Sequence, residues 1–279
     1  MSTIDLISAS AFSYQELTDA YNRTRVDYMV PMPMNASKLH EYVITYDIDM
    51  KGSAVAIDGN EVLGLSMLGS RPGRAWISRL GVVRQNRRHG AGTALVQHMI
   101  DESKLQEANY IIIEVIDNNI PAHTLFTKLG FKQTRQLLVL GRPPGPPKIK
   151  PPVSQVRTIK YNRAMELLSQ RRSKPTWIEE TNSLNNAGNI EAFYAYLQDG
   201  SKGWLVCQNT IFQLSRIMLQ TEIGDPLQVG RALLYHLHKE YSKKDTKTEN
   251  LPVSDPHWPV FKEMGYFELF RRNEMVLEF

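Results

Sequence analysis

The sequence predicts a mixed α/β fold arranged as two tandem domains. The chain has 279 residues, just under two domains at roughly 150 residues each. Strand and helix patterns alternate in the first half, and the second half repeats their order. Residues 141–152 hold six of the fifteen prolines, so this stretch continues neither a helix nor a central strand. We therefore expect a first domain at residues 1–141, a linker at 142–153 and a second domain at 154–279.

The first half opens with a short strand, expected at residues 4–8. Ser13 and Glu16 fit a capping box, which predicts a helix running to about Tyr28. The stretch MVPMPM, residues 29–34, interrupts that helix, and a second helix is expected at residues 36–46.

The rest of the first half predicts a sheet whose later strands are connected by two helices. Asp58-Gly59 is a hairpin signal between expected strands at 53–57 and 62–68. The further elements are a strand at 75–83, a helix from Gly90 to about Gln106, a nearly continuous apolar strand at 110–116, a short helix at 122–129 and a strand at 132–140.

Three landmarks of the first half recur in the second half. The hairpin signal Asp199-Gly200, the helix start at Gly230 and the turn at Gly265 follow their counterparts by 141, 138 and 135 residues. Their order, type and spacing agree, so we interpret the second half as an internal duplication of the first.

Composition narrows the class of protein. Hydrophobic residues make up 42% and charged residues 22%, as in soluble globular proteins. The lone Cys207 excludes an internal disulfide and a cysteine-rich metal site, and fits a reducing compartment. The chain has no signal peptide at its start and no apolar run near the roughly 20 residues that cross a bilayer. We expect a cytoplasmic protein that binds no membrane.

Charge patterning gives little support to nucleic-acid binding. The net charge is +4, and the basic residues fall in small clusters rather than along one stripe. We expect most of these clusters to be solvated surface, and we expect no nucleic-acid partner. His236 and His238, two apart on an expected helix, do not share a face, so we expect no metal.

One of these basic clusters lies inside a glycine-rich loop between a strand and a helix. Gly90 and Gly92 open the helix, where backbone N–H groups are unpaired and the helix dipole is positive. Arg87, Arg88 and His89 add side-chain donors. This chemistry predicts a phosphorylated ligand, most naturally a pyrophosphate. The loop lacks GxxxxGK[ST], and it lacks GxGxxG with a later acidic residue, so neither a P-loop nor a dinucleotide site is expected.

The loop resembles motif A of the GNAT N-acetyltransferase superfamily, [Q/R]-x-x-G-x-[G/A], at residues 87–92. Residues 119–131 resemble that family's second motif, N-x-x-A-x-x-x-Y-x-K-x-G-F, with Phe126 where tyrosine is usual. The resemblance covers roughly residues 4–140, and the second half is similar to the same fold in degenerate form. It implies two GNAT-like domains, each a central, mixed but mostly antiparallel sheet flanked by helices.

The resemblance also implies acetyl-CoA, or a related acyl-CoA, as co-substrate. The backbone amides that would cradle its pyrophosphate are those of Arg88, His89, Gly90, Ala91, Gly92 and Thr93. The strand edge at Leu80, Gly81, Val82 and Val83 would pair with pantetheine, and the Val82 amide would polarise the thioester carbonyl. Asn119 and Ala122 would line the pantetheine channel, with Phe126 as core or channel wall. Lys128 would reach a phosphate.

The implied reaction moves an acetyl group to a primary amine by direct attack in a ternary complex. The amine must lose a proton, and the leaving thiolate can take one up. Phe126 has no proton to give, so either the thiolate leaves unprotonated or Tyr28, or another hydroxyl of the acceptor loop, replaces it. Glu114, among isoleucines, is either the general base or a strand residue that caps a neighbouring backbone group. Ser78 and Arg79 are candidates to face the acceptor, and alternation sends one to each side of the sheet.

The second copy differs where phosphate would bind. Asp225 replaces the arginine and Gln228 replaces the first glycine, which opposes pyrophosphate binding. We expect one cofactor per chain, in the first half, with the second copy structural or shaping the acceptor site. The rival interpretation is a non-catalytic acyl-CoA-binding or interaction module. The sequence leaves open the acceptor, a small-molecule or peptide amine, the acyl length and the oligomeric state, a homodimer included.

Overall fold

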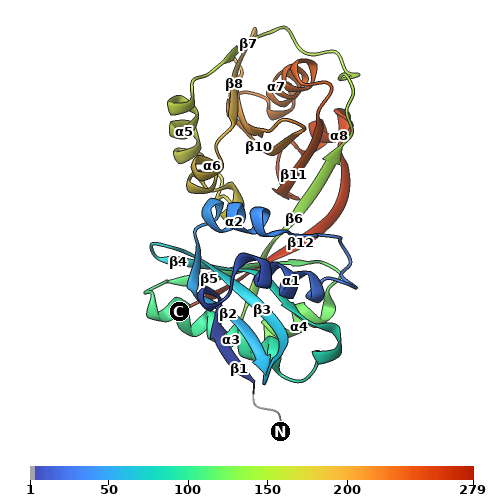
Figure 1. The fold of residues 1–279 in the computed structure, drawn as a ribbon. Helices are drawn as coiled ribbons and strands as arrows, with labels where there is room; N and C mark the ends of the chain where they lie inside the picture. Colours follow the sequence, from blue (N-terminus) through green and yellow to red (C-terminus); the bar gives the residue numbers. More distant parts are fainter. Residues whose placement is uncertain (1–3) are drawn as a thin grey trace. The chain divides into compact units, whose positions relative to one another are not determined.

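The chain folds into two α/β units in the computed structural model, which describes residues 4–279. The first unit runs to Thr134 and includes Glu274–Phe279, and the second unit is Arg135–Asn273. Its elements are drawn in Figure 1. Those up to the middle of the chain are β1 (Asp5–Ser8), α1 (Tyr14–Thr24), α2 (Ala36–Thr45), β2 (Ile48–Asp58), β3 (Glu61–Arg71), β4 (Arg74–Val82), α3 (Ala91–Leu105), β5 (Tyr110–Ile116), α4 (Ile120–Lys128) and β6 (Lys132–Arg142).

The later elements follow a stretch, residues 143–153, that forms neither helix nor strand. They are β7 (Ser154–Thr158), α5 (Tyr161–Ser169), α6 (Thr181–Ala187), β8 (Ile190–Leu197), β9 (Lys202–Asn209), β10 (Gln213–Ile223), α7 (Pro226–Glu240), β11 (Asp245–Pro252), α8 (Trp258–Glu263) and β12 (Phe267–Glu278). Short 3-10 turns lie at Ala9–Ala11, Arg84–Asn86 and Trp177–Glu179.

Each unit is built on a mixed, mostly antiparallel sheet, as predicted. In the first unit the strand order is β1-β2-β3-β4-β5 followed by the end of β12, and β4 and β5 are parallel. In the second unit the order is β6-β11-β10-β9-β8-β7, and β10 and β11 are parallel. The series from β2 to β6 therefore recurs as β8 to β12, which supports duplication.

Local sequence signals explain the main turns and helix starts. The Ser13 side chain accepts from the Glu16 N–H while Glu16 accepts from the Ser13 N–H, which confirms the predicted capping box. The helix ends at Thr24, earlier than predicted. Both hairpin signals lie at β-turns, between β2 and β3 and between β8 and β9.

The last strand of each half of the chain contributes to the unit built mainly from the other half. Residues of β6 from Arg135 onward belong to the second unit, where β6 pairs with β11. Glu274–Phe279, at the end of β12, belong to the first unit, where Met275 is 1% exposed in the core. The expected division at residues 141 and 154 follows chain order, whereas the units are assembled across it.

Helices cover both faces of the first unit's sheet. Ala75 and Ile77 of β4 join the core formed with α3 and α4. Trp76 and Ser78, which alternate with them, contact Tyr42 of α2 on the other face. This second face carries the polar groups described below. Among the described residues, no helix is both long and apolar enough to span a membrane.

Candidate functional site

The edge of β4 loses its strand partner halfway along. Its parallel pairing with β5 consists of Arg74 with Tyr110, Ala75 with Ile111 and Trp76 with Ile112. In the described chain, residues 77–82 of β4 have no such partner on β5. A strand edge without a partner offers N–H and C=O groups to an extended ligand.

The predicted edge residues lie on this stretch. Leu80, Gly81 and Val82 end β4, and the Val83 N–H donates to the Leu63 carbonyl of β3 at 2.8 Å. Because successive N–H groups of an extended strand point to opposite edges, that of Val82 faces away from β3. A Cβ on Gly81 would collide with the side chain of Thr24 at the end of α1, so glycine allows this close approach.

Helix α3 begins with donors that no side chain caps. Its N-cap, Gly90, has φ of +92° and makes no side-chain hydrogen bond. The first helical bond runs from the Ala94 N–H to the Gly90 carbonyl, so the N–H groups of Ala91, Gly92 and Thr93 have no partner within the helix. Gly92 lies where the start of α3 meets β4 and α4, since a Cβ there would be 3.5 Å from both Val82 and Leu125.

The charged side chains of this loop are not equivalent. Arg87 donates to both oxygens of Asp27, at 2.7 and 2.8 Å, and to the Val82 carbonyl. The hydrogen bond from Arg87 lowers the pKa of Asp27. Arg88 and His89 are exposed, as is Lys128 at the end of α4. Arg88 forms no hydrogen bond or ion pair within residues 4–279, so its charge is available to a ligand.

The second motif forms the start and the core face of α4. Asn119 is the N-cap, and its side chain accepts from the Ala122 N–H at 3.3 Å. Ala122 is half-buried. Phe126 is 1% exposed and stacks edge-on against Phe131, with ring centroids 5.4 Å apart, so it lies in the core.

A polar cluster lies on the face of the sheet covered by α1 and α2. The Trp76 indole N–H donates to Glu114 at 2.6 Å, and the Tyr42 hydroxyl lies 2.6 Å from Ser78 Oγ. Burial raises the pKa of Tyr42, so this hydroxyl stays neutral.

Tyr28, the candidate acid, lies near the end of β4 through Arg25. The centre of the Tyr28 ring is 4.1 Å from the Arg25 guanidinium, and Arg25 donates to the Leu80 carbonyl.

The prediction that Ser78 and Arg79 point to opposite sides of the sheet is wrong. Ser78 contacts Tyr42, and the Arg79 guanidinium lies 4.2 Å from the same ring. A bulge causes this, because the register of β3 and β4 shifts between the pairs Leu65–Gly81 and Met67–Ser78. Arg79, inside the bulge, has φ of +53°, which turns its side chain back to the face of Ser78.

Sequence reasoning missed several members of this cluster, namely Tyr21, Tyr42 and Trp76. One signal was present, since Tyr42 and Tyr46 are four residues apart on an expected helix and so share a face. In the structure Tyr46 packs against both Tyr42 and Trp76.

The second copy differs at the start of its equivalent helix. The Asp225 carboxylate accepts from the Leu227 N–H at 3.0 Å, and Pro226 has no N–H to offer. A negative side chain therefore caps this helix. Within residues 4–279, no group of three or more His, Cys, Asp or Glu side chains is placed to hold a metal ion.

Comparisons with known proteins point to one family. Residues 15–131 match the Acetyltransferase (GNAT) family model. No curated protein matches the sequence. Among solved structures, a GCN5-related N-acetyltransferase from Sphaerobacter thermophilus aligns with a TM-score of 0.73 at 14% identity, over 99% of this chain and 95% of its own.

Two further structures match almost the whole chain. A tandem GNAT protein from the clavulanic acid biosynthesis pathway has a TM-score of 0.64 at 13% identity, over 99% of this chain and 98% of its own. A GCN5-related N-acetyltransferase from Kribbella flavida has a TM-score of 0.57 at 15% identity, over 98% and 70%. These identities show the fold. Residues 15–131 are thus a domain of the GNAT acetyltransferase family, in a chain with the fold of tandem GNAT proteins.

Proposed function

We propose that the first unit transfers an acetyl group from acetyl-CoA to a primary amine, by direct attack within a ternary complex. The observation that carries this proposal is the stretch of β4 that has no partner strand on β5 in the described chain, followed at once by the uncapped start of α3. An extended amide-bearing chain such as pantetheine fits the edge, and a pyrophosphate fits the unpaired N–H groups of Ala91, Gly92 and Thr93. Acetyl-CoA has both features in one molecule.

Each end of the proposed site has a distinct role. The Val82 N–H would donate to the thioester carbonyl oxygen and stabilise the negative charge that develops there. Arg88 and His89, exposed beside the helix start, would contact the phosphates, and Lys128 would add a charge from α4. The Asp225 cap would keep the second unit free of cofactor, so we expect one acetyl-CoA per chain.

Proton transfer would be divided between Glu114 and a separate acid. Glu114 would take the proton of the attacking ammonium, directly or through water, while the Trp76 indole holds the carboxylate in place at 2.6 Å. Phe126 cannot serve as the acid. Tyr28 is our candidate, and departure as a thiolate with pKa about 8.5 costs about 2 kcal/mol near neutral pH if no acid acts.

A calorimetric titration tests cofactor binding. We expect acetyl-CoA to bind wild-type protein at one equivalent per chain and to fail with Gly90→Glu, because a carboxylate would occupy the pyrophosphate position. Gly265→Glu is the matched control, since Gly265 also has a positive φ, +87°, and open space around it. Failure of acetyl-CoA and of longer acyl-CoAs to bind wild-type protein would overturn the proposal.

The burial of Phe126, with no hydroxyl at this point of α4, favours a second candidate, an acyl-CoA-binding module without catalysis. Thiol release from acetyl-CoA in the presence of a broad panel of primary amines separates the two. Binding with no thiol release above the amine-free rate would support the module and exclude transfer.

A further inference from the structure

We infer that Arg79 binds a carboxylate of the acceptor, so that the substrate is an amine that also carries a carboxylate, such as an amino acid. This inference rests on the proposed acetyl transfer and names its substrate class. Three observations on Arg79 support it: its backbone conformation, the nature of its neighbouring side chains and the absence of a negative partner in the described chain.

The backbone of Arg79 is held in a conformation that arginine does not favour. Its φ of +53° lies in the left-handed region, which is unfavourable for a residue other than glycine. The bulge in β4 imposes this conformation and directs the side chain toward α1 and α2. Such a conformation persists only where the surrounding structure imposes it, and here it turns the side chain into the cluster with Tyr42.

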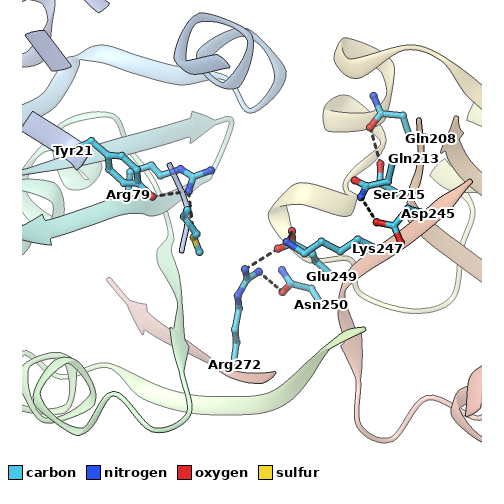
Figure 2. A network of polar contacts seen from close by, with 11 residues as sticks. Tyr21, Arg79, Gln208, Gln213, Ser215, Asp245, Lys247, Glu249, Asn250 and Arg272 are labelled. Atoms are coloured by element: carbon cyan, nitrogen blue, oxygen red, sulfur yellow. Dashed lines mark hydrogen bonds and ion pairs between the residues drawn. The ribbon is translucent and has the colours of Figure 1, made fainter. Parts of the chain in front are cut away.

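The neighbours of Arg79 are aromatic and neutral. Nη1 donates to the Tyr21 hydroxyl at 3.0 Å, as Figure 2 shows, and the guanidinium lies 4.2 Å from the centre of the Tyr42 ring. The remaining contact of Nη1 is the Met32 sulfur at 3.7 Å. A thioether is a weak acceptor, so this contact does little for a cation.

Arg79 lacks a negative partner. Within residues 4–279 no carboxylate forms an ion pair with it, its Nε is buried without a hydrogen bond, and Nη2 donates none. A guanidinium stays charged at any physiological pH. A partly enclosed charge with unused donors costs free energy, and an anion that binds there recovers it.

Two other enclosed arginines of this protein pair with carboxylates. Arg71 pairs with Asp47 at 2.8 Å, and Arg272 pairs with Glu249 at 2.7 Å (Figure 2). The comparison with Arg216 is closest, because it occupies the equivalent bulge in β10 with φ of +50°. Arg216 donates to the Gln208 amide oxygen at 2.7 Å. The first unit gives Arg79 a hydroxyl and a sulfur instead.

Charge and position select a carboxylate near the reacting groups. One guanidinium balances one negative charge, and its planar fork matches the two oxygens of a carboxylate. The same fork also fits a phosphate, but a phosphate monoester carries about two negative charges at pH 7, and the nearby Arg25 already donates to the Leu80 carbonyl. Arg79 and Glu114 both act electrostatically on Tyr42, so the anchor and the proposed base share one face. An amine anchored by its own carboxylate would be held beside that base.

Matched acceptors test the inference. Each common L-amino acid is compared with its amide and its decarboxylated amine, and kcat/KM is measured by thiol release from acetyl-CoA. With wild-type protein we expect the best amino acid to exceed its amide by about 10- to 100-fold, the range for a hydrogen bond to a charged group. Arg79→Met should remove this preference, Arg79→Lys should keep part of it, and Arg216→Met, the matched control, should keep all of it.

A second variant leaves Arg79 in place. Met32→Glu puts a carboxylate at the position of the sulfur, so it should raise the melting temperature and abolish the preference for amino acids. Met32→Gln, of the same shape but neutral, should keep the preference. If Met32→Glu behaved like Met32→Gln, the guanidinium would not be an open anion site.

The outcomes separate this inference from the proposed function. Equal turnover of acids and amides by wild-type protein overturns the inference and leaves acetyl transfer intact. No turnover, with amino acids still binding the CoA-loaded wild type but not Arg79→Met in calorimetry, overturns transfer and supports the carboxylate site. Neither binding nor turnover across the panel overturns both.

Discussion

The Asp27 carboxylate accepts two hydrogen bonds from the Arg87 guanidinium, at 2.7 and 2.8 Å. This pair links the end of the first helical region to the glycine loop and neutralises one of the loop's three arginines. Arg87, the arginine at the first position of motif A, therefore stabilises the loop through Asp27 in this structure. The neighbouring Arg88 has no such partner in the described chain.

The two arginines should differ in their effect on cofactor binding. We expect Arg88→Met to weaken acetyl-CoA binding about 5- to 10-fold, and Arg87→Met about twofold, because only Arg88 offers a free charge-assisted hydrogen bond. Titrations at low and high salt should show a smaller salt dependence for Arg88→Met. A larger loss with Arg87→Met would mean that Asp27 releases its partner when the ligand binds.

The contact between Gly81 and Thr24 predicts a size limit. Gly81→Ala brings a Cβ into the Thr24 side chain, so we expect it to lower the free energy of unfolding by about 1–3 kcal/mol. Thr24→Ala in the same chain should recover part of this loss. Gly92→Ala, whose Cβ meets only ordinary 3.5 Å contacts, is the control and should change stability far less. Denaturant melts are measured for the wild type, Gly81→Ala, Thr24→Ala, the double variant and Gly92→Ala. Strict additivity of the Gly81→Ala and Thr24→Ala effects would exclude a direct clash.

The hydrogen bond between Trp76 and Glu114 predicts a change in the pH–rate profile. Glu114→Gln should lower kcat about 10²- to 10⁴-fold with little change in acetyl-CoA affinity, as expected for loss of a general base. Trp76→Phe removes a donor to the charged carboxylate, so the acid limb of kcat/KM should move to higher pH. A Glu114→Gln enzyme of nearly wild-type kcat would make this glutamate a structural strand residue.

Glu179, in the second unit, predicts a pH dependence of stability. Burial raises the pKa of Glu179 to about 7, against hydrogen bonds from Thr176 that lower it. Its folded pKa lies above its unfolded value of 4.5, so its contribution is complete below pH 4.5 and is lost as pH rises toward 7. Glu179→Gln should remove that decline and make the protein more stable than wild type at pH 8, by about 1–3 kcal/mol in urea melts. Parallel curves for both proteins from pH 5 to 8 would contradict this.

Local signals in the sequence were sufficient for the fold class and the main turns. Asp58-Gly59 and Asp199-Gly200 predict hairpins because their residues favour the tight turns that strands require. Ser13 and Glu16 predict a helix start because their side chains cap it reciprocally. These are short-range interactions, readable without knowledge of the rest of the chain.

The arrangement of the polar cluster was not readable in this way. A strict period of two places Ser78 and Arg79 on opposite faces, and only the shift in register with β3 brings them together. The pairing of Asp27 with Arg87 joins residues 60 positions apart. Interactions of this range depend on tertiary contacts that no local pattern records.

The exchange of last strands bears on how the protein is made. Residues 274–279 leave the ribosome about 140 residues after Thr134, so the first unit waits with an unfilled sheet edge and without Met275 in its core while the whole second unit is synthesised. The second unit receives β6 before most of its own strands exist. The half that begins first is thus completed last, and neither half, cut from the other, carries all of its own sheet.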